Sequence, residues 1–161
     1  MTIVQKISPF LWFDQQAEQA VELYTTLFQD SKVLTVNRYG DAGPGPKGSV
    51  MLVEFQLAGQ HFMALNGGPS RKLTEAISLM VHCDSQEEVD RLWSKLTANG
   101  GREDQCGWLK DPFGLSWQII PKRFTEMLRD PDKTRVDRVF RAMLTMKKFD
   151  LPRLEQAYRG T

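Results

Sequence analysis

Histidine and cysteine are scarce in this sequence of 161 residues, which contains two of each. The cysteines, Cys83 and Cys106, lie far apart and form no C-x-x-C motif, so the spacing of a zinc site is lacking. No apolar run is long enough to span a bilayer. The first residues include Lys6 but no apolar segment before a small-residue cleavage site, which argues against a secretory signal. We therefore expect a cytoplasmic protein with reduced thiols and no membrane partner.

The sequence also has little net charge, only +1, and this balance gives no reason to expect a nucleic-acid partner. The charge is unevenly distributed, because 11 Lys and Arg residues but only 6 Asp and Glu residues lie from Pro121 onward. This basic segment is either a phosphate-binding patch or the solvated face of helices, and the second interpretation is the more common one. A hydrophobic fraction of 41% is ordinary for a globular protein of one domain or two small modules.

The order of predicted elements occurs twice along the chain. Alternating and helical apolar spacing predicts a strand over 7–13, a helix over 17–28 and strands over 32–39, 49–57 and 61–65. The glycine- and proline-rich segment Gly40–Gly48 is predicted to be an irregular, mobile loop. A second strand, helix and further strands follow over 76–121. We predict an α+β fold of two βαβββ modules, at about 7–66 and 76–121, which together form one domain.

The stretch Cys106–Pro121 is unusually rich in large side chains. It predicts two strands, Cys106–Lys110 and Leu115–Ile120, around an Asp-Pro-Phe-Gly turn in which Pro112 fixes φ and Gly114 tolerates a positive φ. We interpret this hairpin as the wall of a pocket.

The residues after Pro121 have apolar side chains at helical spacing from Phe124 to Met146 and again from Leu151. They predict a helical C-terminal extension over 122–161 that packs on the domain.

Several motifs resemble those of a known family: P-F-L-W-F-D at Pro9–Asp14, L-N-G-G-P at Leu65–Pro69, C-G-W-L-K-D-P-F-G-L-S-W-Q-I at Cys106–Ile119 and R-A-M-L-T-M-K-K at Arg141–Lys148. With these motifs the chain resembles the PhnB-like branch of the glyoxalase/bleomycin resistance/extradiol dioxygenase superfamily, also called vicinal oxygen chelate proteins. This branch is often labelled 3-demethylubiquinone-9 3-methyltransferase. The resemblance implies that the two modules curl into a partly open, mixed-sheet barrel with its ligand inside. It also implies a homodimer, because such barrels are commonly completed between chains.

The same resemblance implies where a divalent metal would be held, since its ligands come from the first and last strands of each module. The matching positions here are Pro9, Leu65 or Asn66, Ala76 and Gln118. At most two neutral amides could bind a metal there, whereas hard cations require several charged oxygens and transition metals require imidazole or thiolate. We therefore expect no cofactor, and a divalent metal only if its ligands are displaced to other positions.

A pocket of another kind fits the residues that remain. Because side chains alternate along a strand, Gln118 would face the cavity with Ser116 and Ile120, while Trp117 and Ile119 face the helices. Trp108 and Lys110 would share one face with Cys106. On the first strand Phe13 would line the cavity with Pro9 and Leu11, and Phe10 and Trp12 would point outward. The predicted ligand-binding residues are Phe13, Asn66, Cys106, Trp108, Lys110 and Gln118.

An indole beside an amide, a thiol and an ammonium suits a small aromatic or conjugated metabolite. We therefore expect a small-molecule binding protein whose catalytic residues, if any, cannot be assigned from the sequence. The alternative is a metal-dependent lyase or dioxygenase of the same superfamily with displaced ligands. Two other hypotheses are a metal-free enzyme with Cys106 as nucleophile and a module that acts through its basic tail. Trp108 as a core residue and Lys110 as a solvated strand end are the competing structural interpretations.

Overall fold

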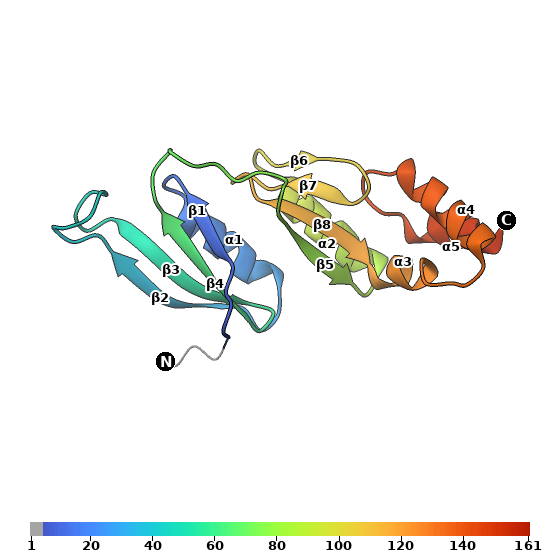
Figure 1. Ribbon diagram of the computed structural model, residues 1–161, viewed down its shortest axis with the longest axis horizontal. Coiled ribbons are helices and arrows are strands. Elements are labelled where there is room, and N and C mark those ends of the chain that lie inside the picture. The colour runs from blue at the N-terminus through green and yellow to red at the C-terminus, as the bar shows by residue number, and fades with distance from the viewer. Residues whose placement is uncertain (1–4) are drawn as a thin grey trace. The chain divides into compact units, whose positions relative to one another are not determined.

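A computed structural model describes residues 5–161 and divides the chain into two compact units, Met1–Leu73 and Thr74–Thr161 (Figure 1). Each unit has its own four-stranded sheet and its own core. No helix between residues 5 and 161 combines the length and the apolar character that a membrane span needs.

The first unit contains β1 (Phe10–Phe13), α1 (Ala17–Leu27), β2 (Lys32–Arg38), β3 (Val50–Leu57) and β4 (Gln60–Asn66). Its strands lie in the order β1-β4-β3-β2. β1 pairs with β4 in parallel, and the other pairs are antiparallel. The first and last strands of the unit are therefore neighbours.

Helix α1 covers one face of this sheet because its apolar residues recur at three- and four-residue spacing. Ala20, Val21 and Tyr24 are fully buried there, as are Val53 and Phe55 of the facing strand β3. This layer is the core of the first unit.

The second unit repeats the topology with β5 (Ser78–Cys83), α2 (Gln86–Thr97), β6 (Arg102–Glu103), β7 (Trp108–Lys110) and β8 (Ser116–Pro121), in the order β5-β8-β7-β6. Ser85 caps α2, since its side chain accepts a hydrogen bond from the backbone N–H of Glu88 at 3.1 Å. The buried stripe of α2, which includes Leu92 and Leu96, packs on the face of the sheet that carries Trp117 and Ile119.

The turn between β7 and β8 is organised by the buried carboxylate of Asp111. It accepts hydrogen bonds from the backbone N–H groups of Phe113 and Leu115, at 2.8 and 3.1 Å, and from Trp117 Nε1 at 2.9 Å. Gly114 has a φ of 91°, as the predicted turn requires. One residue thus fixes both the turn and the indole that fills the core behind it.

Three helices complete the second unit: α3 (Lys122–Met127), α4 (Lys133–Leu144) and α5 (Leu151–Arg159). Met127, Phe149 and Leu154 are buried by at least 99% of their surface. A Cβ at Gly107 would overlap the ring of Phe149, so the start of β7 packs closely against this segment. The helices therefore contribute to the core of the unit.

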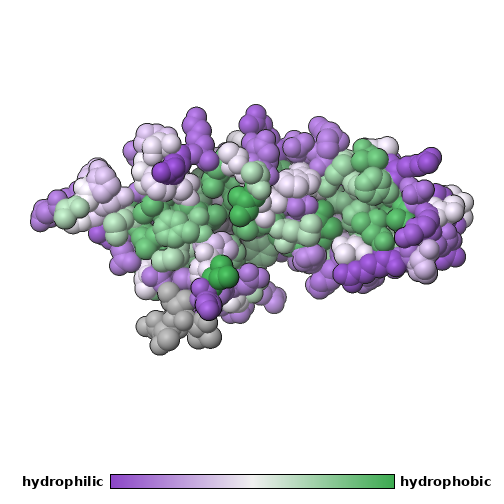
Figure 2. All heavy atoms as spheres, in the orientation of Figure 1, coloured by the Kyte–Doolittle hydropathy of each residue, from purple (hydrophilic) through white to green (hydrophobic). Residues whose placement is uncertain are grey.

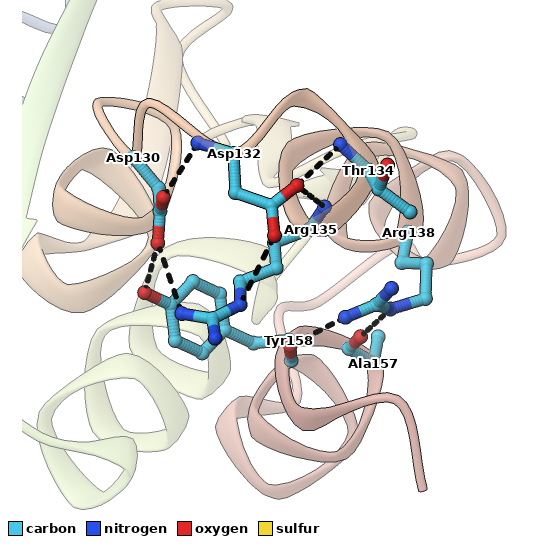
Figure 3. Close-up of polar contacts among 7 residues, drawn as sticks. All are labelled: Asp130, Asp132, Thr134, Arg135, Arg138, Ala157 and Tyr158. Atoms are coloured by element: carbon cyan, nitrogen blue, oxygen red, sulfur yellow. Dashed lines mark hydrogen bonds and ion pairs between the residues drawn. The ribbon is translucent and has the colours of Figure 1, made fainter.

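A polar cluster joins α4 to α5 (Figure 3). Tyr158 donates its hydroxyl hydrogen to Asp130, and Arg135 extends over the tyrosine ring at 5.5 Å from its centre. Arg138 donates from Nε and Nη2 to two backbone carbonyls of α5, at 2.8 and 2.9 Å. Together these contacts close the last turn of α5 onto α4.

These observations confirm the predicted α+β class, with two open mixed sheets and C-terminal helices. The predicted strand Cys106–Lys110 is too long, because β7 begins at Trp108. Cys106 and Gly107 have φ values of 57° and 81° and form a turn whose N–H groups bond to the carbonyls of Met146 and Lys147. A backbone in this left-handed region cannot continue a strand.

Candidate functional site

The candidate site lies on the face of the second unit's sheet that is opposite α2, which we call the open face. It carries Trp108 and Lys110 of β7, Ser116 and Gln118 of β8, and Ser78 and Met80 of β5. The strand pairing sets these residues side by side, because Gln118 is the partner of both Trp108 and Met80, and Ser116 is the partner of both Lys110 and Ser78. Trp117 and Ile119 point to the opposite face, as the alternation predicts.

The open face is mixed in chemistry. Trp108 is half-buried, and Met80 leaves 47% of its surface exposed. Gln118 Nε2 donates to Ser78 Oγ at 2.9 Å. The arrangement offers the aromatic plane of Trp108, the thioether of Met80 and the amide of Gln118 within one small area.

Two polar groups frame this area. Lys110 Nζ lies 2.9 Å from Glu75 Oε2, and its hydrogen bond lowers the pKa of Glu75. Ser116 Oγ is buried and has no hydrogen-bond partner among residues 5–161. A buried hydroxyl without a partner is uncommon in folded proteins.

Cys106 does not share the open face with Trp108 and Lys110, contrary to the sequence-based interpretation. It lies in the turn before β7, where its thiol is directed toward the carbonyl oxygen of Met143 at 3.8 Å. The left-handed backbone of Cys106 and Gly107 interrupts the alternation on which the prediction depended.

In the first unit the predicted facing of β1 is reversed. Phe13 and Leu11 are buried on the α1 side, with 3% and 6% of their surface exposed, whereas Phe10 is 53% exposed on the other side. Aromatic and aliphatic residues occupy both faces of this strand, so hydrophobicity could not distinguish them. Phe13 is therefore a core residue rather than part of the open side of its sheet.

Asn66 has a role in joining elements of the first unit. Its Oδ1 accepts a hydrogen bond from the N–H of Ala17 at 2.8 Å, and its Nδ2 donates to the carbonyl of Val50 at 3.1 Å. The Asn66 amide thus caps the start of α1 through its oxygen and holds the start of β3 through its nitrogen. Both polar atoms of the side chain therefore have a partner.

Sequence reasoning missed a polar chain in the first unit. His61 Nδ1 lies 2.9 Å from Ser8 Oγ, and His61 Nε2 lies 3.3 Å from Glu54 Oε2. Glu54 of β3 and His61 of β4 lie at positions that strand alternation directs away from α1, and this alternation is the signal that could have grouped them. The contact between Ser8 and His61 ties the segment before β1 to the sheet.

The donors at the places where the superfamily would bind a metal do not fit a divalent cation. Asn66 is engaged as a helix cap, and Gln118 donates to Ser78. Among residues 5–161 no three His, Cys, Asp or Glu side chains are grouped to hold a metal. One neutral amide in each unit is too weak a ligand set for a divalent cation.

Comparison with known proteins identifies the family of this fold. A family model described as 3-demethylubiquinone-9 3-methyltransferase matches residues 5–120. The chain belongs to this family. The 3-demethylubiquinone-9 3-methyltransferase-like, or PhnB-like, proteins are part of the glyoxalase/bleomycin resistance superfamily. No curated protein matches the chain.

Solved structures agree with this assignment. The PhnB protein from Bacillus cereus is 36% identical, with a TM-score of 0.67 over 73% of this chain and 99% of that one. The protein PA1353 from Pseudomonas aeruginosa is 22% identical, with a TM-score of 0.60 over 73% and 98%. The fosfomycin resistance protein FosX from Listeria monocytogenes is 14% identical, with a TM-score of 0.53 over 80% and 100%. The last two show a shared fold only.

Proposed function

We propose that this PhnB-like protein binds a small aromatic or conjugated metabolite on the open face of its second unit. Trp108 would stack on the flat part of the ligand, and Gln118 and Lys110 would bind its polar edge. The observation that carries the proposal is the strand register, which sets the half-buried indole of Trp108 beside Gln118 and on the same face as Lys110.

We do not extend the methyl-transfer activity in the family's name to this chain. A nucleotide-like methyl donor is commonly held by a glycine-rich turn between a strand and a helix. The glycine pair after β4 leads to β5, and the pair Gly100 and Gly101 follows a helix instead of preceding one. No described element of the chain supplies the expected cradle.

The alternative remains a metal-dependent lyase or dioxygenase with displaced ligands. One observation favours it, namely the imidazole of His61 beside the carboxylate of Glu54. We expect no stoichiometric metal after incubation with zinc, nickel, iron or manganese and desalting, measured by elemental analysis. One bound metal per chain that is lost in His61→Ala would favour the alternative.

Binding to the open face is tested by a thermal-shift and fluorescence screen of aromatic metabolites. Trp108→Ala should remove the shift for any ligand found, because it removes the stacking plane. Phe140→Ala is the matched control, since Phe140 is an aromatic residue of α4 with 46% of its surface exposed. A screen without a single ligand, or shifts unchanged in Trp108→Ala, would refute the proposal.

Gln118→Leu provides a sharper test, because it replaces the amide by an apolar group of similar size. The variant should bind the ligand about tenfold more weakly, since the hydrogen bond to the polar edge of the ligand is lost. Ser116→Ala is the control, because removing a buried hydroxyl without a partner among the described residues should leave both stability and affinity nearly unchanged. Unchanged affinity in Gln118→Leu would show that the amide has a structural role only.

A further inference from the structure

A second cavity, separate from the open face, lies within the first unit. It has a volume of about 450 Å³ and lies where β1 and β4 end and α1 begins. Its walls come from three segments: 14–18, 38–50 and 66–69. A volume of this size lies in the range that small-molecule sites occupy.

The first wall is fixed by Tyr39. Its buried ring lies between Gly43 and Gly45, and a Cβ at either glycine would overlap the ring. The hydroxyl of Tyr39 donates to the carbonyl of Asn66 at 2.6 Å. The loop over the cavity is therefore held against the ends of β2 and β4.

Another part of the lining, Gly67 and Gly68, is fixed by Trp12. The indole packs on Gly67 so closely that a Cβ there would overlap it, and Trp12 Nε1 donates to the carbonyl of Gly68 at 2.9 Å. Arg71 lies over the same ring, 5.5 Å from its centre. Both parts of the lining are thus built by specific contacts, as in a preformed site.

Charges of both signs line this cavity without neutralising one another. Arg38 contributes a guanidinium, which donates from Nη1 to the carbonyl of Gly48 at 3.1 Å. Asp14 and Glu18 contribute two carboxylates, and neither has a hydrogen-bond or ion-pair partner within the described residues. The start of α1 stabilises negative charge at these positions.

We propose that this cavity binds a compact zwitterion of the α-amino-acid class. The carboxylate of the ligand pairs with Arg38, whose planar fork suits a carboxylate, and its ammonium group pairs with Asp14 and Glu18. Pro44, Pro46 and Val50 supply the apolar lining for the side chain of the ligand. A ligand with a single charge would form only one of these two pairs and would therefore bind more weakly.

The test uses the full chain and the common free amino acids, with binding followed by amide NMR shifts and calorimetry. We expect saturable shifts at Ser49, Gly67 and Gly68 for at least one amino acid. For that amino acid, N-acetylation and conversion to the amide should each weaken binding about tenfold or more, because each removes one charged contact.

Two variants assign the two ends of the ligand. Arg38→Gln should weaken binding of the free amino acid but not of its amide, which has no carboxylate. Glu18→Gln should weaken binding of the free amino acid but not of its N-acetyl derivative. The matched controls are Lys32→Gln on β2 and Glu22→Gln on α1, which lie outside the cavity lining and should leave binding unchanged.

The proposal is overturned if no amino acid binds, or if affinity is the same for the free, acetylated and amidated forms. Shifts confined to Trp108 and Gln118 would also overturn it, since they would place the ligand on the open face. Because the two sites belong to different units, failure of one proposal leaves the other standing.

Discussion

Cys83 is the residue whose surroundings most change its chemistry. It ends β5 with 1% of its surface exposed and lies near Asp84 and Glu88. Burial, with a smaller contribution from the two carboxylates, raises the pKa of its thiol from 9.0 to about 12. The folded protein therefore keeps this proton at pH values where the unfolded chain has lost it.

The consequence is a loss of stability on the alkaline side. Because the folded pKa is the higher one, the contribution of Cys83 is complete below pH 9.0 and is lost as the pH rises toward 12. Between pH 9.0 and 12, guanidinium titrations at successive pH values should show the free energy of unfolding falling with pH more steeply in the wild type than in Cys83→Ala. The difference between the two slopes should be about 1 kcal/mol per pH unit. Cys106→Ala is the control and should follow the wild type. Parallel curves for the wild type and Cys83→Ala would contradict this assignment.

At the scale of single residues, the sequence establishes only part of the candidate site. The predicted grouping of Trp108, Lys110 and Gln118 on one face agrees with the strand register, because alternation along a strand alone determines it. The predicted face of Phe13 is wrong, and the sequence could not reveal this because β1 carries large apolar residues on both sides. The role of Asn66 depends on a contact with Ala17, which lies far away in the sequence, so local pattern could not reveal it. Whether these residues bind a ligand stays a prediction.

At the scale of elements, the loop between β2 and β3 is irregular, as its composition predicts. The structure adds the reason for two of its glycines, because Gly43 and Gly45 make room for the ring of Tyr39. A composition of glycine and proline indicates a loop but cannot indicate what the loop packs against.

We expect Gly45→Ala to destabilise the first unit by about 1–2 kcal/mol, because the added methyl group must displace Tyr39 or the loop. Gly40→Ala is the matched control in the same loop, since a Cβ there meets nothing within 4 Å, and it should change stability by less than about 0.5 kcal/mol. Chemical denaturation measures both, and amide exchange at Gly48 reports the loop directly. Equal effects of the two variants would show that Tyr39 does not fix the loop.

At the scale of the whole molecule, the repeat of two modules was predictable because each has its own hydrophobic pattern. The place of the C-terminal helices within the second unit was harder to predict, since it depends on Phe149 meeting Gly107. The homodimer and the cytoplasmic location stay predictions. Light scattering at twice the mass of one chain would support the dimer.

Removing residues 122–161 should unfold the second unit, because it takes away the buried side chains of α3, α4 and α5. Near-ultraviolet circular dichroism and amide NMR should show the loss. Two point variants separate the loss of packing from the loss of chain length. Leu154→Ala, at a fully buried leucine, should lower the free energy of unfolding by about 2–5 kcal/mol. Leu144→Ala, at a leucine with 55% of its surface exposed, should lower it by less than about 0.5 kcal/mol. A truncated protein with an intact second sheet would show that the helices are an independent appendage.

The parallel pairing of β1 with β4, and of β5 with β8, also bears on how the chain folds during synthesis. In each unit the strand that emerges first from the ribosome has no sheet partner until the strand that emerges last is complete. Pairing of strands that are so far apart in the sequence is slow, because the intervening residues must first form a closed loop. For that interval Phe10 and Trp12 have an unpaired backbone edge, which is the period when a chaperone or a second nascent chain would find β1 available.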